Sequence, residues 1–376
     1  MDKFSRTDTS LLGSWWWNLD KWIFASVCAL CIIGLVLLFS ASPEVADHIG
    51  KAPDFFIKKQ AVFLPMAILT MLFFSILNEK WLKFFAMTVF ISALLLMIAV
   101  IFKGYEIKGA KRWITVNGIT VQPSEFIKPA FAVLCAWLLC IKETVIVTFR
   151  KYSFRIKKGY FLATPLFAVT IGMLLNQPDF GMTVTICAIF GMECFIFGIP
   201  WKAVFVLATT FAGIIGSAYV FIPHVHIRIN NFFNPGEHDN YQVKVAIDAF
   251  SSGGLFGTGP GEKGIYVPDS HTDFILAIIG EQFGLFIALL VLSLYAVIFI
   301  RGIYDIYGKS NAFVIVSVCG LLTQLGFQAI VNMTSTLGLI PPKGMTLPFI
   351  SYGGSSLLST GMMMGMILSL CSVKRR

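Results

Sequence analysis

The chain has 376 residues, of which 57% are hydrophobic and only 13% are charged, and its mean hydropathy is +0.79. Soluble domains carry roughly twice this charged fraction, so the composition excludes a soluble globular protein. The formal net charge of +9 therefore reports membrane orientation first, and we expect no nucleic acid partner. We predict an all-α polytopic membrane protein with a single transmembrane domain over residues 1–376.

Residues 1–21 are polar and basic, and we expect them to form a cytoplasmic tail. No short apolar core followed by small residues begins the chain, so we expect no cleavable signal peptide. The triplet Trp15–Trp17 is typical of an anchor at the headgroup level of the membrane. All eight cysteines lie in apolar runs, which favours small packing residues over redox or metal chemistry.

A transmembrane helix needs about 20 apolar residues. We therefore expect about ten spans, at 22–42, 60–78, 81–102, 126–146, 159–176, 181–198, 201–222, 273–300, 311–333 and 352–373. Most of the 29 Lys and Arg residues fall on the cytoplasmic side when the N-terminus is placed inside, and the run RKYSFRIKK is the strongest example. This bias predicts that both the N-terminus and the C-terminus are cytoplasmic.

This orientation places the longest loop, residues 223–272 between helices seven and eight, outside the membrane. Its segment SSGGLFGTGPGEKG mixes glycines with aromatic and apolar residues, which predicts an ordered, closely packed lid. GTGPG lacks the GxxxxGK[ST] pattern of a nucleotide-binding loop. The spacing of His224 and His226 near Glu237 and Asp239 matches no strong metal template, so we expect no metal site there.

Some basic residues lie on the outer side, against the usual bias, at Lys103, Lys108, Lys111, Arg112 and Lys343. Two interpretations remain open. Arg112 and its neighbours either snorkel or pair with Glu106 and Glu125, or they face an anionic ligand at the outer surface.

The stretch PDSHTDFILAIIGEQFGL carries carboxylates into the eighth span. Asp273 either caps that helix, as Ser270 or Thr272 also could, or acts as a general base at the membrane surface. Glu281 lies about 12 Å deeper along the helix. Such intramembrane acids are either buried structural groups or functional ones, and for Glu193 in the sixth span we favour a structural role.

The ninth span places Gln324, Gln328 and Asn332 on one helical face. A polar stripe of this kind usually makes hydrogen bonds between helices, and it can also line a polar cavity.

The sequence resembles the SEDS family of bacterial cell-envelope proteins, which includes RodA, FtsW and SpoVE. Five segments carry the resemblance: RWITVNGITVQPSEFIK, NQPDFGMT, YQVKVAIDAFSSGGLFGTGPG, PDSHTDFILAIIGEQFG and PPKGMTLPFISYGGSS. They occur in family order and spacing, and with the predicted spans they cover most of the chain. KGMTLPFISYGGSS is more similar to the division members, such as FtsW, than to the elongation members.

The resemblance implies a peptidoglycan glycosyltransferase that polymerises lipid II at the outer face of the bacterial inner membrane, at the division septum. Asp273 of the HTDF motif corresponds to the family's proposed catalytic aspartate. The matching motifs further imply substrate-binding roles for Arg112, Glu125, Lys128, Glu281, Lys343 and Ser351. The family commonly has two glutamates where this chain has Glu281–Gln282, which puts a role of the second position in doubt.

Partners implied by the resemblance are lipid II, the growing glycan linked to undecaprenyl diphosphate, an FtsI-like class B penicillin-binding protein and other division proteins. No cofactor is firmly implied, and a divalent cation, magnesium or manganese, stays open. Two other functions also stay open. A lipid II flippase would use intramembrane carboxylates as well, and a non-catalytic scaffold would position the penicillin-binding protein.

Overall fold

The computed structural model describes residues 10–107, 110–116, 119–149, 152–221, 230, 241–260 and 264–372. Helices dominate, as the sequence predicts. They are α1 (Leu11–Asn18), α2 (Lys21–His48), α3 (Phe55–Ile76), α4 (Glu79–Lys103), α5 (Pro123–Leu139), α6 (Lys158–Asn176), α7 (Phe180–Ile196), α8 (Trp201–Phe221), α10 (Tyr241–Ser252), α11 (Ile275–Ile278), the π-helix η1 (Ile279–Phe283), α12 (Gly284–Ile306), α13 (Ala312–Thr336) and α14 (Gly354–Cys371).

Seven helical stretches in the described part of the chain are long and apolar enough to cross a membrane. They are α2, α3, α4, α6, the joined stretch Ile275–Ile306, α13 and α14. The other three expected spans coincide with α5 and α7, of 17 residues each, and with α8, of 21 residues. The structure therefore confirms a multi-pass membrane protein, and the total of ten spans stays a prediction.

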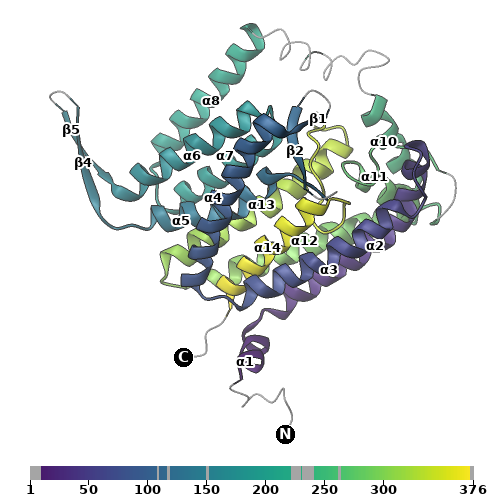
Figure 1. The fold of residues 1–376 in the computed structure, drawn as a ribbon, viewed down its shortest axis with the longest axis horizontal. Coiled ribbons are helices and arrows are strands. Elements are labelled where there is room, and N and C mark those ends of the chain that lie inside the picture. The colour runs from purple at the N-terminus through teal and green to yellow at the C-terminus, as the bar shows by residue number, and fades with distance from the viewer. Residues whose placement is uncertain are drawn as a thin grey trace.

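The bundle is built around α13 and α14, with α2 and α3 packed along one side (Figure 1). Buried residues make up 83% of the apolar window of α14 and 67% of that of α13, against 28% for α4. Large apolar side chains such as Phe39, Leu69 and Leu95 instead face outward from α2, α3 and α4. A helix that is apolar all round and exposed on one side suits a lipid environment.

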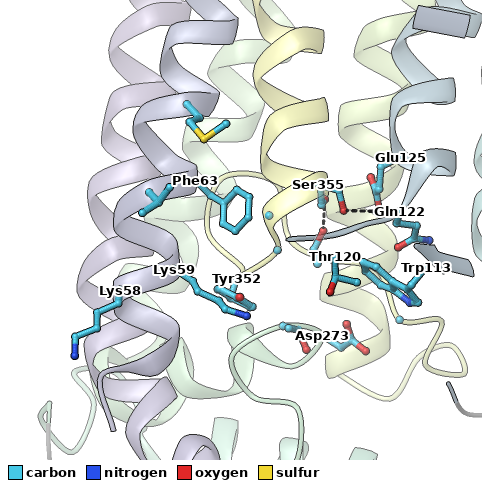
Figure 2. A pocket seen from close by; sticks show the side chains of 18 residues that line it. Lys58, Lys59, Phe63, Trp113, Thr120, Gln122, Glu125, Asp273, Tyr352 and Ser355 are labelled. Atoms are coloured by element: carbon cyan, nitrogen blue, oxygen red, sulfur yellow. Dashed lines mark hydrogen bonds between the residues drawn. The ribbon is translucent and has the colours of Figure 1, made fainter. Parts of the chain in front are cut away.

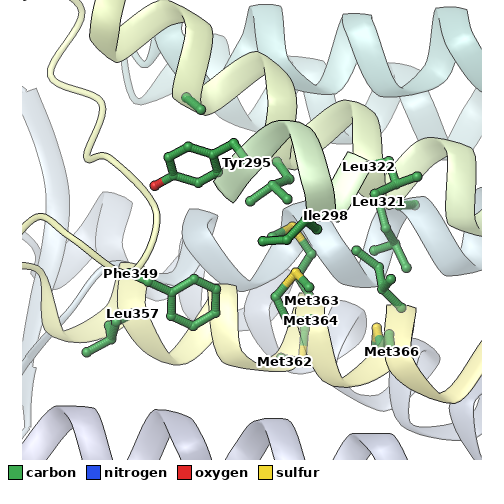
Figure 3. Close-up of a cluster of buried hydrophobic side chains, with 14 of the residues drawn as sticks. Tyr295, Ile298, Leu321, Leu322, Phe349, Leu357, Met362, Met363, Met364 and Met366 are labelled. Atoms are coloured by element: carbon green, nitrogen blue, oxygen red, sulfur yellow. The ribbon is translucent and has the colours of Figure 1, made fainter. Parts of the chain in front are cut away.

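Small residues let the central helix α14 approach its neighbours closely. A Cβ atom added at Gly361 or Gly365 would lie 2.4 Å from a backbone oxygen of α3, at Ala67 and Met71 respectively. This spacing is the close-contact pattern that stabilises helix pairs where lipid removes the hydrophobic driving force. The methionines between and beside these glycines fill the opposite side, against residues of α12 and α13 (Figure 3).

Two small antiparallel sheets interrupt the helical pattern, and the sequence analysis missed both. One has the order β1 (Tyr105–Ile107), β2 (Ala110–Val116), β3 (Ile119–Val121), and the other pairs β4 (Thr144–Phe149) with β5 (Tyr152–Lys157). The predicted span 126–146 is therefore wrong at its end, because α5 stops at Leu139. The β-branched run of β4 is apolar enough to extend the hydropathy signal, yet it favours a strand.

The predicted span 273–300 is not one continuous α-helix either. It divides into α11, the π-helix η1 and α12, and η1 meets α12 at Gly284, whose φ is +74°. The glycine-rich segment after α10 supplies hydrogen bonds across this break. Thr258 N donates to Glu281 O (2.8 Å), Gly259 N donates to Gln282 O (3.1 Å), and Leu285 N donates to Gly254 O (3.0 Å). A distant segment thus stabilises a break that the local sequence does not announce.

Both described ends of the chain lie at one end of the bundle. Ser14 and Ser372 line the same cavity, of about 720 Å³, together with the α12–α13 connection. This agrees with the two termini sharing one side of the membrane, as the predicted orientation requires.

That orientation leads to a labelling prediction. A cysteine placed at Ser252, at the end of α10, should react with a membrane-impermeant thiol reagent in intact cells. A cysteine at Ser153, in β5, should react only after the membrane is opened. The unsubstituted protein controls for its eight native thiols, which are all free. The reverse pattern would overturn the predicted orientation and place Asp273 on the cytoplasmic side.

Candidate functional site

Two loops that are far apart in sequence form the site. The HTDF loop (residues 266–274) precedes α11, and the TLP loop (residues 337–353) joins α13 to α14. Tyr352 N donates to His271 O (2.8 Å), and the Ser351 hydroxyl donates to Thr272 O (2.6 Å). The same hydroxyl accepts a hydrogen bond from Leu347 N (2.8 Å). Ser351 therefore fixes the two loops to one another and is absent from the cavity lining.

Asn332, in the last two turns of α13, joins both loops to the helix bundle. Its Nδ2 donates to Asp273 O (2.8 Å) and to Met345 O (2.7 Å), and its side chain is almost fully buried. A hydrogen bond in a buried, low-dielectric place holds its partners more firmly than one in water. The backbone beneath the Asp273 carboxylate is thus held by a residue for which the sequence predicted only a share in a polar stripe.

The helix that follows Asp273 is not capped by it. The residue before the first turn of α11 is Phe274, and no side chain accepts a capping hydrogen bond there. A turn centred on Asp269 orients Asp273 instead, because Asp269 O accepts from Asp273 N (3.1 Å). Asp269 has a φ of +55°, and Phe349 in the TLP loop has a φ of +64°. Such backbone strain persists only where the surroundings enforce it, and it gathers at functional sites.

Asp273 lies on the wall of a cavity of about 620 Å³. One side is formed by Trp113 and Thr120 of the small sheet together with Gln122 and Glu125 at the start of α5, and the other by α3 and the TLP loop (Figure 2). The α3 wall carries apolar Val62, Phe63 and Met66. Val62 and Met66 are also exposed on the lipid-facing surface, so the apolar wall continues to the outside of the bundle.

Lys58 and Lys59 in the first turn of α3 contribute positive charge to this cavity. Lys58 makes an ion pair with Asp54, whereas the Lys59 ammonium lies over the ring of Phe55, 4.4 Å from its centroid. In Figure 2 the Lys59 side chain points toward Tyr352 and the side of the cavity that holds Asp273. Neither lysine was among the predicted site residues, although the predicted orientation places both on the outer side of the membrane.

Arg112, which was predicted to bind an anion, contacts other groups of the protein instead of lining the cavity. Arg112 donates to the backbone oxygens of Gln177 and Pro178, and it lies 3.8 Å from the carboxylate of Asp179. Its pairing with Glu125, part of one of the two open interpretations, is not what the structure shows, because Glu125 pairs with Lys128. The side chain of Glu106 lies outside the described residues. Asp179 also accepts a hydrogen bond from Gln122 (3.2 Å), so Arg112 braces the cavity wall from outside.

Glu125 and Lys128 form a buried ion pair on α5. The Lys128 ammonium is 2.8 Å from the Glu125 carboxylate, and its side chain is only 1% exposed. Removing one member of such a pair leaves an uncompensated charge, so both contribute to the integrity of the wall. Glu125 lines the cavity and Lys128 lies behind it.

Lys343 lies beside Asp273, in a narrow crevice that is also lined by Asn332, Ser335 and Gly344. It is therefore near the proposed catalytic group but outside the main cavity lining. Substrate roles for Arg112, Lys128, Lys343 and Ser351 stay predictions.

Glu281 stabilises the lid. Its carboxylate accepts a hydrogen bond from Ile265 N (2.7 Å), and a Cβ atom at Gly264 would lie 2.3 Å from it. The described part of the 223–272 loop, α10 with residues 253–260 and 264–272, is thus ordered and closely packed, as predicted. Because Thr258 N and Gly259 N already donate to backbone oxygens of η1, they are not available to a phosphate. The predicted residues His224, His226, Glu237 and Asp239 lie outside the described residues.

Two ring side chains of the site keep their neutral forms. Burial lowers the pKa of His271 from 6.5 to about 4, partly offset by Asp269. Burial raises the pKa of Tyr352 to about 12, so its phenol stays a hydrogen-bond donor near neutral pH. His271 packs against Phe56 and Tyr352, with ring centroids 4.3 and 5.7 Å away. These contacts identify His271 as a packing residue between α3 and the two loops.

Residues 21–376 match the profile of the cell cycle protein family FtsW/RodA/SpoVE. The chain belongs to this family. A relative named probable peptidoglycan glycosyltransferase FtsW from Caulobacter vibrioides is 37% identical over 370 residues, which cover 98% of this chain and 93% of the relative. The protein of the same name from Legionella pneumophila is 31% identical, with 93% and 90% covered.

Solved structures of this family agree with the fold. A structure described as the structural coordination of polymerization and crosslinking by a peptidoglycan synthase complex matches with a TM-score of 0.78 and 25% identity, covering 95% of this chain and 98% of the other. The crystal structure of the rod shape determining protein RodA from Thermus thermophilus matches with a TM-score of 0.68 and 26% identity, covering 95% and 97%. The resemblance predicted from the sequence motifs is confirmed.

The low pKa of His271 predicts a dependence of stability on pH. As the pH falls from about 6.5 to about 4, the unfolded chain protonates this ring while the folded protein does not, so the free energy of unfolding decreases. The variant His271→Phe keeps an aromatic ring but removes the titration. Its melting temperature should fall less than that of the unsubstituted protein between pH of about 7 and about 5. Parallel decreases would contradict a neutral, buried His271.

Proposed function

We propose that this chain is a peptidoglycan glycosyltransferase that polymerises lipid II at the outer face of the inner membrane, during septal wall synthesis. The observation that carries the proposal is the position of Asp273. Its carboxylate lines a large cavity while three hydrogen bonds from the TLP loop and α13 hold the backbone of residues 271–273. The names of the Caulobacter and Legionella relatives support the reaction class.

Asp273 is the general base in this proposal. The acceptor hydroxyl attacks the anomeric carbon of the donor sugar, and its proton passes to the Asp273 carboxylate. The bond between that carbon and the diphosphate oxygen breaks, and the polyprenyl diphosphate leaves with the electron pair. Because the leaving group is already an anion, no second carboxylic acid is needed to protonate it, in contrast to glycoside hydrolysis.

The lysines of α3 suit the diphosphate of the substrate. Lys59 points into the cavity and Lys58 lines it, so positive charge faces the place where negative charge develops on the leaving group. Val62, Phe63 and Met66 form the neighbouring apolar wall. A lipid-linked diphosphate needs this pairing of a cationic region with an apolar path that is continuous with the bilayer.

A divalent cation would find few protein ligands here. The carboxylates that line the cavity are Asp273 and Glu125, and Glu125 is neutralised by Lys128. The described residues hold no cluster of three or more His, Cys, Asp or Glu side chains. Magnesium is usually held by one or two carboxylates together with substrate phosphates, so a recruited ion would bind Asp273 and the diphosphate.

A partner enzyme belongs to the proposal. The described chain is a membrane bundle with two small sheets, while peptide crosslinking is a separate reaction. The similar peptidoglycan synthase complex couples polymerization to crosslinking, which supports a class B penicillin-binding protein as the partner. Association with other division proteins at the septum is part of the same proposal.

The proposed role of Asp273 as general base leads to a prediction. Asp273→Asn keeps size and hydrogen-bonding capacity but removes the proton acceptor, so polymerisation by the purified protein should fall by about 10²- to 10⁴-fold. Asp269→Asn is the matched control, because asparagine tolerates a positive φ and Asp269 is absent from the cavity lining. Near-normal polymerisation by Asp273→Asn, with a normal melting temperature, would remove Asp273 from the mechanism.

The proposed contact between Lys59 and the diphosphate leads to another prediction. Lys59→Met keeps the length and apolar stem of the side chain but removes its charge, so kcat/KM for lipid II should fall by about tenfold or more. Lys51→Met is the control, because Lys51 is an exposed lysine at the same membrane face but outside the cavity lining. Equal effects of the two substitutions would show that general surface charge, and no specific contact, is responsible.

A detergent assay separates this function from the alternatives. The solubilised protein with its partner, in the absence of a bilayer, should convert lipid II into glycan chains. The product should also form when the partner's transpeptidase nucleophile is removed, and it should disappear with Asp273→Asn. A flippase has no reaction to perform without two leaflets, and a scaffold contributes no Asp273-dependent step. Failure of an intact complex to form polymer would favour one of those readings.

A further inference from the structure

A second carboxyl group lies deep in the bundle, away from the site. Glu193 is in the last turn of α7 and is 0% exposed. No hydroxyl, amide or basic group of the described residues donates to either of its oxygens, and the polar group beside it is the thiol of Cys135 on α5. In the described part of the chain, no basic side chain comes within ion-pair distance of it. An isolated carboxylate in such a low-dielectric place is very costly, so Glu193 is in its neutral form and carries a hydrogen-bond donor.

The Glu193 carboxyl occupies a notch in the neighbouring helix α13. A Cβ atom added at Gly320 would lie 2.2 Å from Oε1 of Glu193 and 3.0 Å from its carboxyl carbon. Glycine in a helix interior costs about 1 kcal/mol relative to alanine, so this position requires a reason for a missing side chain. The close approach of the Glu193 carboxyl to the α13 backbone supplies that reason.

Polar groups on both sides of the notch can complete the contact. Ser317 and Gln324 share the helical face of Gly320, about 4.5 Å and about 6 Å away along the axis. Both side chains are buried, and neither Ser317 Oγ nor the Gln324 amide makes a hydrogen bond in the described residues. A neutral carboxyl offers one donor and two acceptors, so rotations of the side chains of Ser317 and Gln324 would let them form hydrogen bonds with Glu193.

The two helices that meet at this notch both extend to the site. From Glu193, α7 runs about 21 Å back to Asp179, which binds Gln122 and Arg112 at the cavity wall. From Gly320, α13 runs about 18 Å forward to Asn332, which holds the backbone of Asp273. The segment between Gly320 and Asn332 contains no proline, so a shift of α13 at the notch reaches Asn332.

We propose that Glu193 is a positioning residue for sugar transfer. Its neutral carboxyl packs against Gly320 and prevents α13 from shifting along α7. This contact therefore sets the position of Asn332 beneath Asp273. The proposal rests on the proposed function, because it takes Asp273 as the reacting group. Its effect is on the geometry of Asp273 rather than on substrate affinity, so it predicts a change in kcat with little change in KM.

Four variants test it in the polymerisation assay, with the protein in complex with its partner. Glu193→Gln keeps volume, a donor and an acceptor, so its kcat should stay within about twofold of normal. Glu193→Leu and Gly320→Ala should lower kcat by about tenfold or more, because small displacements of catalytic groups are costly. Gly191→Ala is the matched control, since it adds the same methyl to α7 where nothing lies within 4 Å.

A double-mutant cycle shows whether the notch is the cause. The double variant Glu193→Ala, Gly320→Ala should have a higher kcat than Gly320→Ala alone, close to that of Glu193→Ala alone. The reason is that the methyl group added at position 320 then has space. The proposal is overturned if Gly320→Ala is as harmless as Gly191→Ala, or if Glu193→Leu retains normal kcat. It is also overturned if Glu193→Gln is as damaging as Glu193→Leu, since a charge would then be required. If Gly320→Ala does not fold, the Gln and Leu pair at Glu193 still decides.

Failure of the positioning proposal is distinguishable from failure of the proposed function. The same cycle read in melting temperatures should show coupling between positions 193 and 320 whatever the role of Asp273. An active Asp273→Asn variant would reject the proposed function while this coupling remained. Coupling in stability without the loss of kcat at constant KM would reject the positioning role and leave the proposed function in place.

Discussion

The site depends on two hydrogen bonds from one buried amide. Asn332 donates to Asp273 O and to Met345 O, and these carbonyls belong to loops that are separated by a complete helical hairpin. Without this amide, the buried Met345 carbonyl and the half-buried Asp273 carbonyl would each lose a donor, which is costly in a membrane protein. Ser351 and Tyr352 add further hydrogen bonds between the loops, so Asp273 is held before any substrate arrives. Preorganisation of this kind is the main way in which a fixed structure stabilises a transition state.

The surrounding helices hold the two loops in place through the kind of packing that a lipid environment requires. Among the seven span-length stretches, the two C-terminal helices α13 and α14 are the most buried. Polar side chains are directed inward along α13, while large apolar side chains of α2, α3 and α4 face the lipid. Close approach through Gly361 and Gly365 replaces the hydrophobic force that is missing between helices in a bilayer. The outer end of α3 then brings Lys59 and an apolar wall to the same cavity as Asp273. Lys59, Asp273 and the apolar wall of α3 are therefore neighbours because the helices pack together, and not because these residues are close in the sequence.

Much of this organisation is legible in the sequence. Hydropathy locates the helices, because each span must satisfy its own backbone hydrogen bonds. The family resemblance implies roles in one reaction for Asp273 and Lys343, and the structure places both residues in one crevice. The errors have physical causes. The β4 run is as apolar as a span, and the break at η1 depends on hydrogen bonds from the lid, which lies more than twenty residues earlier in the chain. Lys59 was missed because a cavity is a property of packed helices, and a charge pattern does not reveal that Arg112 contacts Asp179.

The most direct test of this account removes the amide that joins the loops. Asn332→Leu keeps a similar volume but cannot donate to Asp273 O or Met345 O. The measurement is steady-state polymerisation of lipid II by the partnered, detergent-solubilised protein, with folding checked by its melting profile. A preorganised Asp273 predicts that kcat falls by about 10- to 100-fold while KM changes by less than about threefold. Unchanged kcat in a folded Asn332→Leu protein would contradict the claim that this amide positions the catalytic carboxylate.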